Sequence, residues 1–107
     1  MTIEFDHVAI KSTDIARSVE WYMETFKNTK LVYQDNTWAL INVGNASIAF
    51  VMPDQHKPHI CFQLKGEHKK SYYSKYDFKM HRDKTKYCYI DDPDGNTIEF
   101  LVRDNDD

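Results

Sequence analysis

Three side chains of metal-ligating type, His7, His59 and Glu99, occupy segments of the sequence that are typical of β-strands. Side chains alternate between the two faces of a strand, so each of the three lies on the face opposite to its apolar neighbours. Two imidazoles and a carboxylate converging from separate strands form a ligand set for Zn, Mn, Fe, Ni or Co. Taken singly, each histidine could instead be satisfied by a neighbouring carboxylate or backbone group, and His59 could belong to a turn. Glu99 alone could be a charge on a solvated strand face.

An internal repeat gives these residues related positions. His7-Val8-Ala9-Ile10 matches His59-Ile60-Cys61-Phe62 at an offset of 52 residues. Residues 48–51 match residues 98–101 at an offset of 50, and both segments follow a Gly-Asn pair. The chain is therefore predicted to contain two copies of a strand–helix–strand–strand–strand unit. Chance similarity of short apolar strings is the alternative.

Apolar periodicity predicts the elements that hold these residues. The first helix follows Ser12-Thr13-Asp14, which offers several N-cap candidates, and it ends at Asn28-Thr29. It buries one stripe, formed by Ile15, Val19, Tyr22, Met23 and Phe26. A second helix is predicted over residues 65–76. Strands are predicted over residues 3–10, 30–34, 38–43, 47–52, 59–64, 78–81, 87–91 and 97–102. The organisation is one domain, 1–107, with a first module over about 1–53, a second over about 58–103 and an acidic tail at 104–107.

Composition narrows the function classes. The chain has 107 residues, and 14 Lys and Arg against 17 Asp and Glu give a net charge of −3, which argues against a general nucleic-acid binder. No apolar run approaches the length of a membrane span, and the first residues do not resemble a signal peptide. Cys61 and Cys88 are too few for a disulfide scaffold and predict buried free thiols. We expect a cytoplasmic protein with no membrane or nucleic-acid partner.

One segment departs from this average charge. Residues 65–86 hold eight of the 14 cationic side chains and three acids, a local charge of +5 against −8 for the rest. Aromatic residues are interleaved with the lysines. The segment is either a solvated basic helix and loop or a surface that attracts an anionic substrate or a nucleic acid.

Three motifs resemble the vicinal oxygen chelate superfamily, the glyoxalase, bleomycin-resistance and extradiol-dioxygenase group. They are FDHVAI at 5–10, DIARSVEWY at 14–22 and DPDGNTIEF at 92–100. The resemblance covers nearly the whole chain. It implies a single glyoxalase-like α+β domain in which two βαβββ modules form a cupped mixed sheet with helices on the outer face. It also implies a homodimer, in which sites can be shared between chains.

The same resemblance implies a metal site. Ligands in the superfamily come from the first and last strands of each module, which carries over to His7, His59 and Glu99, with one divalent ion (Zn, Ni, Mn, Fe or Co) per site. Ala49 stands at the fourth ligand position. The chain is thus more similar to three-ligand members, the fosfomycin-modifying thiol transferases and extradiol dioxygenases, than to glyoxalase I.

Two functions remain open at the level of sequence. The first is a metal-dependent lyase, isomerase or dioxygenase-like enzyme on a small oxygenated metabolite, with the metal as Lewis acid and Glu99 in the catalytic centre. Trp38, Cys61 and Tyr89 would line the substrate, although each is also explained by packing. Tyr87, Tyr89 and Cys61 are the candidates for proton transfer. The second function is a metal-free binding protein of the bleomycin-resistance type, and a subunit-interaction module is a third possibility.

Overall fold

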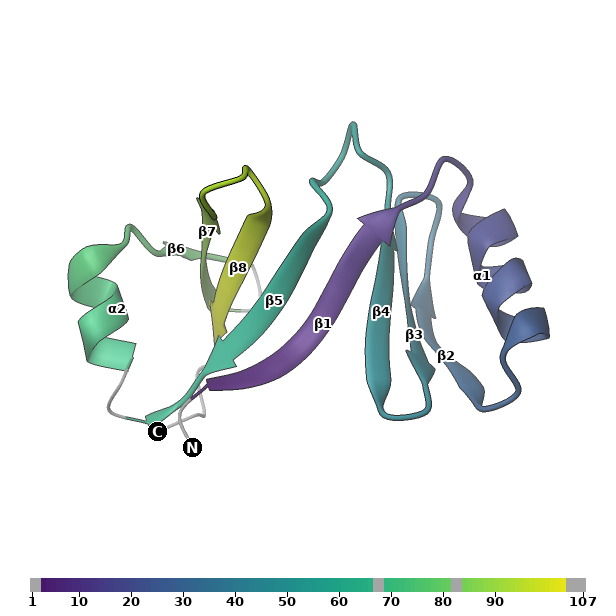
Figure 1. Cartoon of the computed structure of the whole chain (residues 1–107), viewed down its shortest axis with the longest axis horizontal. Helices are drawn as coiled ribbons and strands as arrows, with labels where there is room; N and C mark the ends of the chain where they lie inside the picture. Colours follow the sequence, from purple (N-terminus) through teal and green to yellow (C-terminus); the bar gives the residue numbers. More distant parts are fainter. Residues whose placement is uncertain (1–2, 67–68, 82–83, 104–107) are drawn as a thin grey trace. The chain divides into compact units, whose positions relative to one another are not determined.

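The order of elements along the chain repeats once, as predicted (Figure 1). The computed structural model describes residues 3–66, 69–81 and 84–103, and the predicted acidic tail lies outside them. The first half consists of β1 (Ile3–Lys11), α1 (Ile15–Thr25), β2 (Thr29–Gln34), β3 (Trp38–Val43) and β4 (Ala46–Val51). The second half consists of β5 (His59–Leu64), α2 (Lys69–Lys75), β6 (Lys79–Met80), β7 (Lys86–Asp91) and β8 (Thr97–Val102). These are two βαβββ modules, and the predicted α+β class is confirmed.

The strands form a mixed sheet whose pairing is the same in both halves. The chain divides into two compact units, residues 7–59 (the first unit) and residues 1–6 with 60–107 (the second unit). The first unit has the strand order β2-β3-β4-β1, and the second has β1-β5-β8-β7-β6, so the sheet has eight strands. In each unit, the first strand of a module pairs in parallel with the last, β1 with β4 and β5 with β8. The pairs β2–β3, β3–β4, β6–β7 and β7–β8 are antiparallel.

Helix α1 covers one face of the strands of the first unit (Figure 1). The cluster between them is completely apolar and consists of Ile15, Val19, Ala39, Ile41 and Phe50. The helix begins where Asp14 accepts a hydrogen bond from the Arg17 N–H at 3.1 Å. An N-cap of this kind contributes about 1 kcal/mol to stability, because it satisfies one of the unpaired N–H groups of the first turn.

Helix α1 ends earlier than the sequence predicts. The last helical residue is Thr25, and Phe26 takes an extended conformation at φ −110° and ψ 125°. Met23 and Phe26, expected in the buried stripe, are 39% and 40% exposed. The Thr29 hydroxyl donates to the Phe26 carbonyl at 2.8 Å, which satisfies an acceptor that the shortened helix leaves open. The apolar spacing in the sequence therefore extends beyond the end of the helix, to a residue where the backbone already leads to β2.

Helix α2 lies in the second unit and packs through aromatic rings. Tyr72 and Tyr76 contact Phe100 of β8, with ring centroids 4.8 and 5.8 Å apart. The α-helix begins at Lys69 rather than at residue 65, and Gly66 before it adopts a left-handed φ of +72°. Cys61 and Cys88 are buried free thiols, as predicted. Within the described residues, neither helix combines the length and apolar character required to cross a membrane.

Two aspartates that organise turns give the fold a defined acid sensitivity. Hydrogen bonds from Tyr33 and then from Thr37 and Trp38 hold the pKa of Asp35 far below its ordinary value. Asn96 does the same for Asp92, to a smaller extent. A carboxyl whose folded pKa is depressed stabilises the fold above its unfolded pKa of about 3.9, and this contribution is lost as the pH falls through the folded pKa.

We expect Asp35→Asn to be less stable than wild type at pH 7, with a difference that narrows only as the pH falls below about 4. Urea unfolding followed at several pH values from 7 down to about 2 measures the difference. A penalty of equal size at pH 7 and about pH 2 would mean that the charge of Asp35 contributes nothing.

Candidate metal centre

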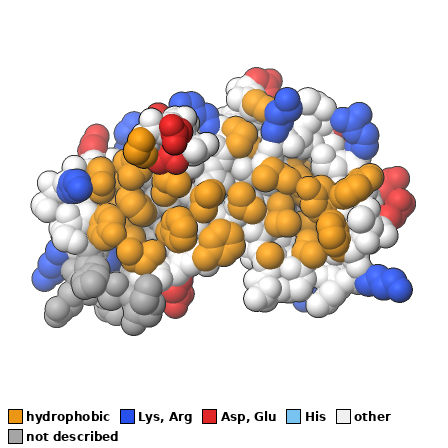
Figure 2. All heavy atoms as spheres, viewed as in Figure 1, with side chains coloured by type: hydrophobic (Ala, Val, Ile, Leu, Met, Phe, Trp, Pro, Cys, Tyr) orange, Lys and Arg blue, Asp and Glu red, His pale blue; other side chains and the backbone are white. Residues whose placement is uncertain are grey.

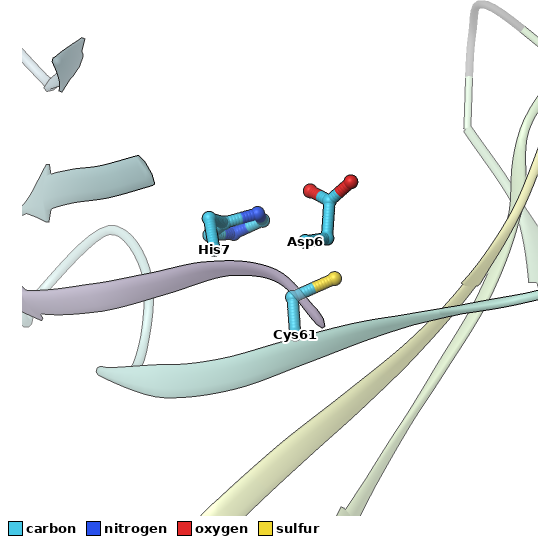
Figure 3. A group of neighbouring side chains, drawn as sticks. All are labelled: Asp6, His7 and Cys61. Carbon is cyan, nitrogen blue, oxygen red and sulfur yellow. The ribbon is translucent and has the colours of Figure 1, made fainter. Parts of the chain in front are cut away.

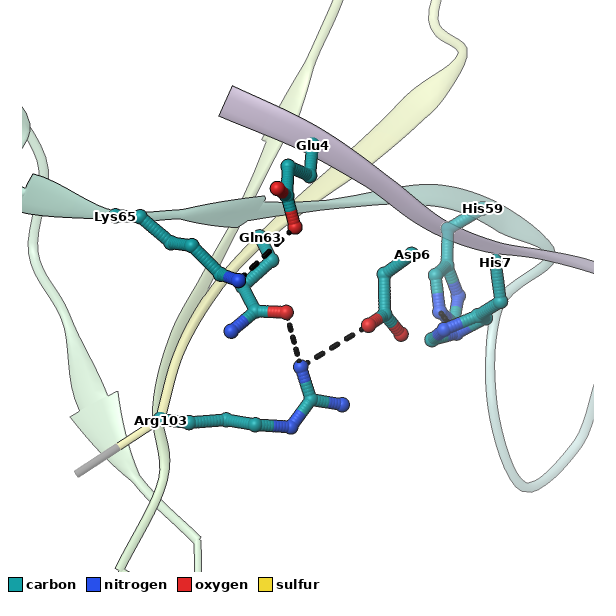
Figure 4. A network of polar contacts seen from close by, with 7 residues as sticks. All are labelled: Glu4, Asp6, His7, His59, Gln63, Lys65 and Arg103. Atoms are coloured by element: carbon teal, nitrogen blue, oxygen red, sulfur yellow. Dashed lines mark hydrogen bonds and ion pairs between the residues drawn. The ribbon is translucent and has the colours of Figure 1, made fainter. Parts of the chain in front are cut away.

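Two imidazoles face each other in the first unit. His7 lies on β1 and His59 is the first residue of β5, and their Nε2 atoms are 3.4 Å apart (Figure 4). This separation is long for a hydrogen bond between ring nitrogens. Two nitrogens bound at 2.0–2.1 Å to one tetrahedral ion would lie about 3.4 Å apart. The pair therefore has the spacing of two ligands of one ion.

A backbone contact fixes the tautomer of His59. The Nδ1 atom of this ring lies 2.7 Å from the carbonyl oxygen of Lys57, and a carbonyl can only accept. Nδ1 therefore carries the proton in the neutral ring, and the lone pair is on Nε2, which is the atom that faces His7. Metal-bound histidines in proteins are usually oriented by a hydrogen bond of this kind. His59 is also buried, at 9% exposure.

Glu99 is a buried carboxylate in the second unit, 5% exposed. It lies in the middle of β8, opposite Cys61 on β5 and Tyr89 on β7. The His81 Nε2 atom lies 3.7 Å from a carboxylate oxygen of Glu99. The His81 ring is stacked on Tyr87, with centroids 3.8 Å apart, which holds the imidazole beside the carboxylate. A buried carboxylate needs such partners or a cation, because burial of an isolated charge is costly.

The registers of the two parallel strand pairs confirm the internal repeat. Ala9, two residues after His7, pairs with Ala49. Cys61, two residues after His59, pairs with Glu99. Ala49 thus takes the place in the first module that Glu99 takes in the second, and it is buried at 4% exposure. The first module offers a methyl group where the second offers a carboxylate.

The predicted substrate-lining residues divide between the units. Trp38 lies in the first unit, half-buried against Ala9 and Ala49, and its ring stacks on Tyr33 with centroids 4.4 Å apart. Cys61 and Tyr89 lie in the second unit on either side of Glu99. Figure 3 shows the Cys61 thiol directed toward the Asp6 carboxylate.

The two groups that flank Glu99 retain their protons at neutral pH. Burial raises the pKa of the Cys61 thiol far above its ordinary value, and the charges of Glu99 and Asp6 raise it further. Burial and then Glu99 also raise the pKa of the Tyr89 hydroxyl. Both groups are therefore proton donors. Cys61 is not a nucleophile, because that role requires the thiolate.

The sequence analysis missed three contributors to this region. His81 is expected in a strand over residues 78–81, but β6 ends at Met80, and no spacing in the sequence places His81 beside Glu99. The Lys57 carbonyl has no signature in the sequence at all. Arg103 has no motif that would mark it in the sequence. In the structure its Nη1 donates to Asp6 at 3.0 Å and to the buried amide oxygen of Gln63 at 2.6 Å (Figure 4). This arginine fixes the start of β1 in the second unit.

The fold is that of the glyoxalase/bleomycin resistance/dioxygenase superfamily. A superfamily member from Vibrio splendidus 12B01 is similar with a TM-score of 0.67 at 13% identity, over 95% of this chain and 100% of that one. A hypothetical protein from Bacillus halodurans C-125 also gives 0.67, at 14% identity over 100% and 99% of the two chains. A methylmalonyl-CoA epimerase, in complex with methylmalonyl-CoA and NH4+, gives 0.64 at 13% identity over 100% and 99%. No family model and no curated protein sequence matches the chain.

Proposed function

We propose that the chain is a divalent-metal-dependent enzyme that acts on a small oxygenated metabolite, with His7, His59 and Glu99 as the protein ligands. The observation that carries the proposal is the His7–His59 pair, whose nitrogens have the spacing of ligands and whose tautomer is fixed at His59. Glu99 supplies the third donor of a mixed nitrogen and oxygen set, which suits Zn, Ni, Mn, Fe or Co. The strand register supports this assignment, because Glu99 pairs with Cys61, which lies two residues after His59.

The metal, when bound, would act as a Lewis acid toward substrate oxygens. Cys61 and Tyr89 hold protons beside Glu99 and can donate hydrogen bonds to an oxygenated substrate. His81, with its Nε2 atom 3.7 Å from a Glu99 carboxylate oxygen, can orient that carboxylate. Proton transfer next to a polarised oxygen is the chemistry of isomerases and lyases, which fits the similarity to an epimerase.

Because Cys61 and Cys88 are free thiols, we propose that the protein is located in the reducing cytoplasm.

One observation favours a second candidate function, metal-free binding of a small molecule. Tyr33 and Trp38 form a stacked aromatic pair, and Tyr33 is 41% exposed. Such a pair can stack on a planar ligand without any metal. A protein of this type would sequester its ligand, as the bleomycin-resistance members of the superfamily do.

Metal content separates the two functions. We expect near-stoichiometric divalent metal in the wild type purified without chelator, and loss of most of that metal in Glu99→Ala, because the variant lacks one of three ligands. Elemental analysis measures both. Glu24→Ala removes an exposed carboxylate from α1 and is the matched control, which should keep the metal. Wild-type protein that stays metal-free after reconstitution with each of the five ions would favour the binding protein.

We also propose that the protein is a homodimer. Apolar side chains gather over the strands in the view of Figure 2. Strand β2 is at the end of the strand order and exposes Leu31, Val32 and Tyr33 by 41%, 52% and 41%. An apolar edge strand of this kind invites pairing with a second chain.

Light scattering is expected to give twice the chain mass of 12.7 kDa. If sites are shared between chains, mixing His7→Ala with Glu99→Ala subunits restores one intact site per mixed dimer, measured as bound metal. Monomers at micromolar concentration would refute the dimer, and absence of recovery in proven mixed dimers would refute sharing.

A further inference from the structure

The basic segment of the sequence forms part of a cavity in the second unit. Lys69 and Lys70 of α2, Lys86 of β7 and Arg103 line one hollow of about 260 Å³, together with Tyr73 and Gly66. The four cations come from three separate places in the chain, so the fold concentrates charge that the sequence only suggests. The candidate metal ligands do not line this cavity.

Two of these cations, Lys70 and Lys86, supply positive charge to the cavity. Lys86 has an aromatic partner, with its Nζ atom 5.2 Å from the centre of the Tyr73 ring. Tyr73 is held in turn by Phe78, edge to face at 4.9 Å. Among the described residues, neither Lys70 nor Lys86 forms an ion pair with a carboxylate. Arg103 pairs with Asp6 through Nη1, at 3.0 Å.

Lys70 and Lys86 line the same hollow and repel each other unless an anion is present. The cavity is smaller than the pockets of roughly 300–1,000 Å³ that enclose whole drug-sized ligands. Lysine and arginine together are the donors that proteins use for phosphate, because a phosphoryl group accepts several charge-assisted hydrogen bonds. The size and charge therefore suit the phosphoryl end of a small molecule whose remainder lies outside.

We propose that this cavity, lined by Lys69, Lys70, Lys86 and Arg103, binds the phosphoryl group of an anionic small molecule. The proposal goes beyond the proposed function and does not depend on bound metal. It gives a role to the charge of residues 65–86, which the candidate metal centre leaves unexplained.

Calorimetric titration of the full-length chain with pyrophosphate tests the proposal. We expect saturable binding to the wild type and about tenfold weaker binding to the double variant Lys70→Ala/Lys86→Ala, which loses two charged donors. The matched control is Lys27→Ala/Lys30→Ala, which removes the same charge from exposed positions of the first unit and should bind like wild type. Glu99→Ala should also bind like wild type, which separates this site from the metal ligands.

Each other result overturns the proposal. Equal weakening in the two double variants would mean that only net charge matters. Absence of saturable binding in the wild type would exclude a phosphoryl site. A single-stranded oligonucleotide that binds where pyrophosphate does not would assign the surface to nucleic acid instead. Circular dichroism confirms that Lys70→Ala/Lys86→Ala is folded, and the single variant Lys70→Glu, which leaves the Lys86–Tyr73 contact intact, should weaken pyrophosphate binding as well.

Discussion

A divalent ion supplied at roughly 100 times its dissociation constant is expected to raise the free energy of unfolding of the wild-type chain by about 2.7 kcal/mol. The ion binds the folded state, in which His7 and His59 face each other, and finds no such pair in the unfolded chain. For a domain of this size the stabilisation corresponds to an increase of about 10–20 °C in the midpoint of thermal unfolding. His59→Ala is expected to lose almost all of this increase. Thermal unfolding by circular dichroism, with each of the five candidate ions in turn, measures the effect.

The matched control for this experiment is His56→Ala. His56 is an exposed histidine three positions before His59, and its removal should leave the metal-induced increase intact. His59→Gln serves as a second variant if the alanine variant does not fold. An increase that survives in both His59 variants would show that the ion binds elsewhere, and the ligand assignment would then be wrong.

Phe50→Ala is expected to destabilise the protein by about 3–5 kcal/mol. The Phe50 side chain is 1% exposed and lies at the centre of the apolar cluster under α1. Its ring contacts Tyr22, with centroids 4.7 Å apart. The variant loses both the buried apolar surface and the ring contacts, and the surrounding backbone can close the cavity only in part. This loss is a large fraction of the 5–15 kcal/mol that typically holds a domain together.

Urea unfolding monitored by tryptophan fluorescence measures the destabilisation. Met80→Ala is the matched control, since Met80 is 60% exposed and its truncation should change stability by less than about 0.5 kcal/mol. A cost for Phe50→Ala no larger than that of Met80→Ala would show that the cluster under α1 does not stabilise the chain.

Strand positions could be predicted well where alternation and turn residues agree. β5 and β8 have the predicted bounds, 59–64 and 97–102, because each alternates in side-chain type and β8 follows an Asp-Gly turn. Helix ends could not be predicted as well. The apolar period of α1 continues to Phe26, but the backbone leaves the helix at Thr25. The backbone conformation of Phe26 and the start of β2 determine where the helix ends, and the spacing of apolar residues indicates neither.

The candidate ligands could be found because the repeat places His7 and His59 at equivalent positions, and Glu99 where the other module has Ala49. Their surroundings could not. His81 reaches Glu99 from the irregular segment after β6, where no periodic pattern fixes the direction of a side chain. The cation cavity forms because α2 packs beside β7, and the number of charges along the chain does not predict that packing.

The hydrogen bond from His59 to the Lys57 carbonyl would escape any scan of amino-acid substitutions. A carbonyl oxygen is the same atom whichever side chain occupies position 57, so Lys57→Ala leaves the acceptor in place. Pro58 between them has a fixed φ and no N–H to compete. An inserted or deleted residue between Lys57 and His59 would move the oxygen away from the ring. Evolutionary drift can therefore change the side chain at position 57 freely, while the two-residue spacing to His59 must be kept.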